Sequence, residues 1–309
     1  MTLTDKKKIG IIFIGILLAC GVYFVFRYHA YAQAKRQQII FESKKAAWER
    51  LKQKLSNEIK LFKGEAGFVI KDLQTGWETS YNKDRLFPSA SLVKMPIMLA
   101  CFIAAEEGKI NLDQEIILRN SDKFSGSGML KDVRPGTVFT IEELIGLMIY
   151  DSDNTAANIL TSMLGVDYLN SVFNYLGLKN TNFSRRIADF RLRDQGVENY
   201  TTAQDMAWLL EQIYHRNLVN RMISDKCLKI LKLQRVNDRL PKYLPVNITV
   251  AHKTGLERNV CHDVGIMFSR KGDFIICVLT QHKNKSATAS KKFIARIALQ
   301  TYVYSEELL

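Results

Sequence analysis

The chain begins with a long uncharged apolar segment and continues with a mostly polar one. Residues 9–26 contain no charged side chain, and these 18 residues would extend about 27 Å as a helix, close to the thickness of the hydrocarbon layer of a membrane. Residues 27–45 are rich in polar and basic side chains and contain no glycine or proline, which suits a helical or extended linker. The pattern predicts a cytoplasmic N-terminus over residues 1–8, a single-pass membrane anchor over 9–26 and a linker over 27–45, with the rest of the chain outside the cytoplasm.

Two other interpretations of the apolar segment stay open. Cys20 follows Leu-Leu-Ala, as in a lipoprotein signal, and a cleaved signal peptide would remove the segment altogether. The apolar run continues past Cys20 to Phe26, whereas the apolar core of a signal peptide is usually shorter and ends in small residues. An uncleaved anchor is favoured for that reason.

The periodicity after residue 45 is that of a folded domain. Apolar positions between residues 46 and 61 recur every three to four residues, which predicts an amphipathic helix. Short β-rich runs predict a hairpin, with strands at 67–70 and 77–81, and later strands at 248–253, 262–269 and 274–281. Helices are predicted at 91–107, 141–150, 155–164, 203–214 and 287–304. Strands from both ends would form one sheet and the helical middle a second lobe, which is an α/β (α+β) domain over residues 46–309.

Composition and charge narrow the class of protein. The chain is 47% hydrophobic and 24% charged, which is ordinary for a protein with a buried core. Of its net charge of +13, most lies in residues 1–63, which carry 13 Lys/Arg against 4 Asp/Glu. Basic residues beside an apolar segment favour membrane lipid as a partner. No basic stripe interleaved with aromatic residues is present, so nucleic acid is not an expected partner.

The five cysteines indicate neither a metal site nor a disulfide framework. Their number is odd and their spacing does not match that of metal ligands, so we expect buried thiols, no metal and no cofactor. A bridge from Cys101 to one of the three later cysteines stays open, because connectivity cannot be read from sequence.

The first candidate for chemistry is a serine three residues before a lysine. Ser91 and Lys94 fall at the start of a predicted helix, where this spacing places both side chains on one face. A serine hydroxyl needs a neighbouring base to act as a nucleophile, and a desolvated lysine can lose its proton and serve as that base. The N-terminus of the helix adds backbone N–H groups that point at developing negative charge.

Two further motifs follow in order. Ser152-Asp153-Asn154 runs on into Thr155-Ala156-Ala157-Asn158, and Lys253-Thr254-Gly255 lies on a late strand. Together the three motifs resemble the signature set of class A β-lactamases and penicillin-binding proteins. The resemblance covers the chain from about Gly64 to Tyr304 and implies a β-lactamase/transpeptidase-like fold, with an antiparallel sheet flanked by helices and an all-helical lobe.

The resemblance also implies roles for the motif residues. Ser91 would attack the carbonyl of a β-lactam or of a D-Ala-D-Ala-like amide, Lys94 would help to deprotonate it, and Ser152 would relay a proton to the departing nitrogen. Lys253 is the fourth catalytic residue that the resemblance implies. The implied substrate-binding residues are Asn154, Thr254, Gly255 and Leu256. Asn154 would bind the side-chain amide of the substrate, and Thr254 with Lys253 would bind its carboxylate. The backbone N–H groups of Ser91 and Leu256 would form the oxyanion hole.

The chain departs from class A β-lactamases in one loop. Those enzymes need a glutamate, usually followed four positions on by asparagine, to activate the water that removes the acyl group. Residues 184–202 lack this pattern, and an ungapped alignment places Arg186 at the glutamate position. Asp189, Asp194 and Glu198 are the candidate carboxylates, with Asp189 foremost, although loop carboxylates close to arginines are more often paired with them. His252 and His262 are interpreted as structural, because the serine and lysine already supply a base.

The sequence thus predicts a serine hydrolase that opens β-lactams through an acyl-enzyme on Ser91. The alternative is a penicillin-binding D-Ala-D-Ala peptidase, or a β-lactam sensor, that is acylated without fast deacylation. A β-lactam or a peptidoglycan stem peptide is the expected small-molecule partner.

Overall fold

The computed structural model describes the backbone of residues 3–283 and 286–307 and, within these ranges, all side chains except those of residues 3–16 and 19. The chain divides into two compact units, residues 1–50 with 306–309, and residues 51–305. The motif residues of the candidate site all belong to the larger unit.

The first helix, α1 (Leu3–Leu61), is continuous from the first unit into the second. No glycine or proline interrupts residues 22–63, and Gly64 follows the end of the helix. Within the residues that the structure describes, no helix has a stretch both long and apolar enough to cross a membrane. Residues 9–16 and 19 of the anchor predicted over residues 9–26 lie outside the described side chains, so this anchor stays a prediction from the sequence.

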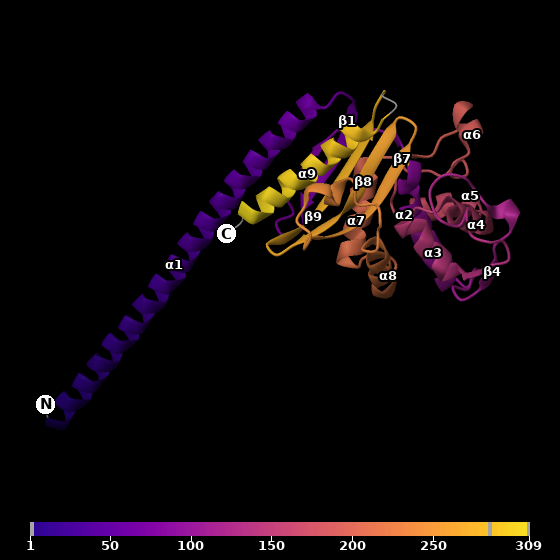
Figure 1. Cartoon of the computed structure of the whole chain (residues 1–309). Helices are drawn as coiled ribbons and strands as arrows, with labels where there is room; N and C mark the ends of the chain where they lie inside the picture. The colour runs from indigo at the N-terminus through magenta and orange to yellow at the C-terminus, as the bar shows by residue number, and fades with distance from the viewer. Residues whose placement is uncertain (1–2, 284–285, 308–309) are drawn as a thin grey trace. The chain divides into compact units, whose positions relative to one another are not determined.

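A five-stranded antiparallel sheet in the order β2-β1-β9-β8-β7 is the scaffold of the larger unit (Figure 1). Its strands are β1 (Glu65–Asp72), β2 (Glu78–Tyr81), β7 (Thr249–Glu257), β8 (Val260–Ser269) and β9 (Gly272–Gln281). β1 pairs with β2 in the predicted hairpin and with β9 on its other side. Strands from both ends of the domain therefore form one sheet, as the sequence predicts. β7 is an edge strand, which leaves one side of its backbone unpaired within the sheet.

Helices cover both faces of the sheet. Successive side chains of a strand point to opposite faces of the sheet. On one face, Val69 of β1 belongs to the core that the sheet shares with the helical lobe. α7 (Ala203–His215) contacts β1, β8 and β9. α9 (Thr288–Glu307) also packs on the sheet, with the ring of Tyr304 edge-on to Phe274 of β9 at 5.8 Å between centroids. Two covered faces hold the sheet rigid, so β7 presents its free edge at a fixed position.

The helical lobe is built around α2 (Lys94–Glu106), which is buried along nearly all of its length. It contacts four helices, α3 (Ile141–Tyr150), α4 (Asn154–Leu164), α5 (Val166–Tyr175) and α8 (Arg221–Leu231). The predicted helices at 141–150, 155–164 and 203–214 are confirmed. α5 and α8 were not predicted, although the buried Leu169, Val172 and Phe173 of α5 and Ile223, Cys227 and Leu231 of α8 have the three- to four-residue spacing of a helix.

The cysteines are free thiols in the structure. Cys101, Cys227, Cys261 and Cys277 are buried and unbridged, so the bridge from Cys101 that the sequence left open is not formed. Burial raises the pKa of Cys101 to about 12, which keeps this thiol protonated and unreactive.

Candidate active site

The predicted nucleophile lies in a short helical turn packed against the free edge of the sheet. This 3₁₀ turn, η1 (Ala90–Val93), precedes α2 and contacts both β7 and β8. Ala90 has a φ of 46°, an unfavourable conformation for a residue with a Cβ atom and one typical of strained functional turns. Ser91 is 8% exposed, and its hydroxyl is hydrogen-bonded to no group in the described part of the chain. The hydroxyl is therefore accessible and uncommitted.

Lys94 is completely buried one helical turn after Ser91. Its Nζ donates to the carbonyl of Ser152 at 2.7 Å and to Oδ1 of Asn154 at 2.8 Å. Burial lowers the pKa of Lys94 to about 7, against a smaller opposing effect of the carboxylates of Asp153 and Glu257. About half of the Lys94 side chains are thus neutral at pH 7 and able to accept a proton.

Ser152 connects the two lysines of the site. It lies between α3 and α4 with a φ of 54°, and Asp153 after it caps the N-terminus of α4 by accepting the amide of Ala156 at 2.9 Å. The Ser152 Oγ accepts from Lys253 Nζ at 2.9 Å and lies 3.4 Å from Lys94 Nζ. A hydroxyl between two buried amines can pass a proton in either direction.

β7 brings Lys253 and the residues after it to the same place. Lys253 is completely buried, and its pKa lies well below the usual value because of burial and then of repulsion by Lys94 and Arg239. Gly255 permits the close approach of β7 to η1, because a Cβ at this position would lie 3.1 Å from His262 and 3.3 Å from Leu92.

Asn154 is held by a glycine-containing loop. Its Nδ2 donates to the carbonyl of Ser125 at 3.0 Å, and its backbone N–H donates to the carbonyl of Ser127. A Cβ on Gly126 would lie 2.8 Å from Asn154 Nδ2, and one on Gly128 would lie 2.1 Å from the Asp153 carboxylate, so both glycines are needed for this approach. The second Nδ2 hydrogen of Asn154 has no acceptor in the described part of the chain.

Arg239 is a site residue that the sequence did not reveal. It is 2% exposed, donates from Nε to the Cys261 sulfur at 3.2 Å and lowers the pKa of Lys253. Its Nη1 has no hydrogen-bond partner in the described part of the chain, although Asp238 lies 3.2 Å away. Arg239 is buried, and its positive charge acts on Lys253.

The two histidines near the site pair locally. Nε2 of His262 donates to the carbonyl of Pro88 at 2.8 Å, and its Nδ1 accepts the amide of Thr280 at 3.1 Å. Burial lowers the pKa of His262 to about 4, so this ring is neutral, which fits the two hydrogen bonds. His252 bonds through Nδ1 to the buried carboxylate of Asp263 at 2.9 Å. Both rings fix the strands around the site and neither is bonded to Ser91 or Lys94.

The candidate deacylation carboxylates of the loop over residues 184–202 are all engaged. Asp189 accepts the amide of Leu192 at 3.1 Å and so caps α6 (Phe190–Asp194). Asp194 forms an exposed ion pair of 2.6 Å with Arg258. Neither carboxylate is bonded to Ser91 or Lys94, so the structure gives Asp189 a capping role.

Glu198 belongs to a buried cluster of alternating charges, which we call the loop cluster. It pairs with Arg185 at 2.6 Å and with Arg193 at 3.0 Å, and both arginines also pair with Glu257 at 3.0 and 3.1 Å. Arg185 is only 1% exposed in its side chain. Because Glu257 directly follows Leu256 on β7, the loop cluster ties the loop to the strand of the candidate oxyanion hole.

The backbone of Ile187 is hydrogen-bonded to a side chain of α4. Asn158, one helical turn after Asn154, donates from Nδ2 to the carbonyl of Ile187 at 3.1 Å and accepts its amide at 3.0 Å. Ile187, rather than the aligned Arg186, is therefore the loop residue held against α4, and it carries no carboxylate. In the described residues no group of three or more His, Cys, Asp or Glu side chains is arranged to hold a metal ion.

Comparison with known proteins agrees with this geometry. The chain is 26% identical over 277 residues to β-lactamase VEB-1 of Pseudomonas aeruginosa, covering 84% of this chain and 91% of that one. Among solved structures it is similar to a β-lactamase from Sphaerobacter thermophilus, with a TM-score of 0.76 and 29% identity, covering 84% of this chain and 98% of the other. It is equally similar to PBP-A, with a TM-score of 0.76 and 27% identity over 84% and 97% of the two chains.

A sequence model of the Beta-lactamase enzyme family matches residues 50–305, which include η1, α4 and β7 with their motifs. The chain therefore belongs to the β-lactamase enzyme family and is a serine hydrolase of the β-lactamase type.

Proposed function

We propose that the protein opens β-lactams by forming an acyl-enzyme on Ser91. The observation that carries the proposal is the buried chain Lys94–Ser152–Lys253, in which both amines contact one hydroxyl and the pKa of Lys94 is close to 7. A base with a pKa near the working pH is the most effective general base. The same arrangement supports the residue roles that the sequence motifs imply.

The proposed acylation assigns one step to each motif residue. Ser91 Oγ attacks the lactam carbonyl carbon while its proton passes to neutral Lys94. As the C–N bond breaks, Ser152 gives its proton to the departing nitrogen and regains one from Lys94 or Lys253. Lys253, Thr254 and Arg239 would bind the substrate carboxylate, and the N–H groups of Ser91 and Leu256 would stabilise the oxyanion.

A specific observation favours slow release of the acyl group. Hydrolysis of the ester needs a base for water, and the carboxylates of the loop are committed to a helix cap, to a surface ion pair and to the loop cluster. We therefore infer that acylation is faster than deacylation. A solved structure of a PBP-A point mutant is described as an acyl-enzyme complex with penicillin G, and it shares 26% identity with this chain. A penicillin-binding peptidase that acts on stem peptides is accordingly the second candidate function.

The test is a mass-spectrometric time course of the full chain mixed with a modest excess of benzylpenicillin. We expect an adduct on Ser91 that forms quickly and decays slowly, and no adduct on Ser91→Ala. Ser89→Ala is the matched control, because Ser89 precedes the same turn and its hydroxyl makes only a long 3.4 Å bond to the carbonyl of Ala90. An adduct on the Ser91→Ala variant would contradict the proposal, and hydrolysis of many equivalents per minute would contradict slow deacylation.

The location of the domain rests on the sequence alone. We propose that residues 9–26 anchor the chain and that the catalytic domain faces away from the cytoplasm, because Lys6, Lys7 and Lys8 precede the uncharged segment. Protease added to intact cells should digest the domain if this is correct, and protection of the domain would refute it.

A further inference from the structure

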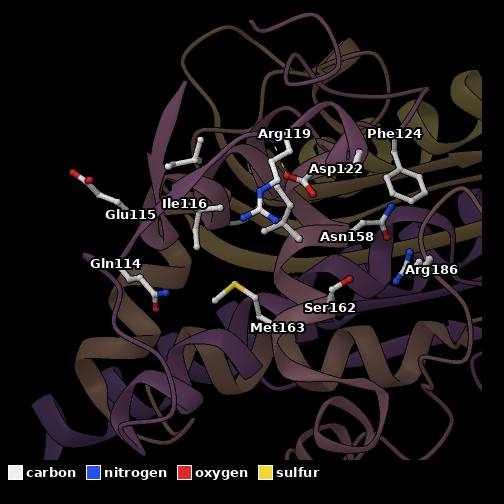
Figure 2. A pocket seen from close by; sticks show the side chains of 13 residues that line it. Gln114, Glu115, Ile116, Arg119, Asp122, Phe124, Asn158, Ser162, Met163 and Arg186 are labelled. Atoms are coloured by element: carbon white, nitrogen blue, oxygen red, sulfur yellow. Dashed lines mark hydrogen bonds between the residues drawn. The ribbon is translucent and has the colours of Figure 1, made fainter. Parts of the chain in front are cut away.

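A pocket of about 600 Å³ lies on the helical lobe beside the candidate active site. Figure 2 shows its wall, which comes from the segment around β4 (Glu115–Ile117) and η2 (Asn120–Asp122), from α4 and from Arg186 at the start of the loop. None of the catalytic residues assigned above lines it. The pocket is therefore separate from the reacting groups.

Two structural links join the pocket to the substrate-binding groups. Asn158 lines the pocket one helical turn after Asn154 on the same face of α4, so the two side chains are about 6 Å apart along the helix. Phe124 lines it as well and directly precedes Ser125, whose carbonyl holds the Asn154 amide. If Asn154 binds the side-chain amide of the substrate, the pocket lies about one helical turn farther along α4.

The pocket lining contains two arginines and two carboxylates. Arg119 and Arg186 line it, and neither guanidinium forms an ion pair with a carboxylate in the described part of the chain. The Asp122 carboxylate accepts the backbone amide of Arg119 at 2.9 Å and is occupied in the η2 turn. The Glu115 carboxylate points away from the other lining side chains in Figure 2. Two arginines without carboxylate partners are well suited to a carboxylate, which guanidinium binds in a bidentate manner.

The remaining lining fits a short hydrocarbon chain. Ile116, Phe124 and Met163 contribute apolar surface. Ser162 contributes a hydroxyl, whereas the side chain of Asn158 is bonded to the backbone of Ile187. Methylene groups can pack on the apolar part while a terminal carboxylate meets the arginines.

We propose that this pocket, the arginine pocket, binds a carboxylate at the far end of the substrate's acyl side chain. Preferred substrates then carry an anionic acyl side chain about four to six atoms long, estimated from the helical rise between Asn154 and Asn158. This inference rests on the proposed acylation of Ser91. The anionic side chain can belong to a β-lactam or to a peptide that ends in D-Ala-D-Ala.

The experiment compares substrates that differ only in this charge. Acylation of the full chain is followed with 7-glutarylamino-cephalosporanic acid and with its uncharged 7-pentanoylamino counterpart. The same two acyl groups on D-Ala-D-Ala, with release of D-Ala as the readout, show whether the side chain arrives on a lactam or on a peptide. Arg119→Gln and Arg186→Gln are the test variants. Arg270→Gln, an exposed arginine in the turn between β8 and β9, is the matched control.

We expect the wild-type chain to react faster with the glutaryl compound of at least one pair. Each test variant should lower the ratio of the charged to the uncharged rate roughly three- to tenfold, and Arg270→Gln should keep the ratio of the wild type. Raising the salt concentration should also lower the ratio. Equal rates within both pairs, or a ratio that neither test variant changes, would overturn the arginine pocket while the acylation proposal stands. Absence of acylation by all four compounds would overturn both.

Discussion

The pH dependence of acylation is the sharpest test of Lys94 as the base. In the structure, burial lowers the pKa of Lys94 to about 7, compared with 10.5 for a lysine in water. Only the neutral amine can accept the Ser91 proton, so the second-order rate constant of acylation should follow the neutral fraction of Lys94.

The magnitude follows from the titration curve. With a pKa of about 7, the neutral fraction rises from roughly 0.09 at pH 6 to roughly 0.9 at pH 8, about tenfold, and changes little above pH 8. With an unshifted pKa of 10.5, the rate would rise about 100-fold between pH 6 and pH 8 and about tenfold more by pH 9. The plateau therefore separates a buried base from a solvated one.

Stopped-flow measurement of benzylpenicillin acylation between pH 5 and pH 10 gives this profile. Lys94→Arg should abolish this pH dependence and lower the rate constant of acylation about a thousandfold or more at pH 7, because guanidinium stays protonated throughout. Glu257→Gln should move the midpoint to lower pH, since the Glu257 carboxylate raises the pKa of Lys94. A rate independent of pH over this range, or the same profile in Lys94→Arg, would refute Lys94 as the base.

Two further predictions concern the loop cluster and Arg239. Glu198→Gln removes the anion that pairs with Arg185 and Arg193, so it should lower the free energy of unfolding by roughly 3 kcal/mol, measured by urea denaturation. Asp194→Asn breaks only an exposed ion pair and should change the free energy of unfolding by less than about 1 kcal/mol. Equal losses of stability in the two variants would contradict the buried loop cluster. Arg239→Gln should slow acylation by benzylpenicillin roughly tenfold or more through loss of a charged contact to the substrate carboxylate, whereas an unchanged rate constant would remove Arg239 from the site.

The catalytic motifs could be predicted from sequence because each depends on local geometry. Ser91 and Lys94 share a face through helical spacing, and the SDN and KTG motifs fall at a helix start and on a strand, where periodicity is informative. The strand pattern likewise predicted the sheet, since the β-rich runs at 262–269 and 274–281 correspond to the paired strands β8 and β9.

The residues that were missed depend on distant contacts. Arg239 lies in an irregular segment before β7, and its burial against Cys261 of β8 leaves no periodic signal. Asn158 was part of a motif, but its bonds to Ile187 cross 29 residues and depend on the path of the loop. Spacing alone aligned Arg186 with the glutamate position, whereas the loop residue that the structure holds against Asn158 is Ile187.

The loop cluster bears directly on whether the acyl-enzyme turns over. Glu198 is the loop carboxylate with the lowest exposure, yet its two oxygens already neutralise Arg185 and Arg193 and accept the amide of Asn199 at 2.8 Å. A general base takes up a proton, and a protonated Glu198 would leave two largely buried guanidinium groups with Glu257 as their shared partner. Breaking such a buried pair costs roughly 3–5 kcal/mol, which would be added to the barrier of deacylation. The contacts that hold the loop in place therefore remove Glu198 from the chemistry, and a carboxylate for rapid turnover would have to come from another position.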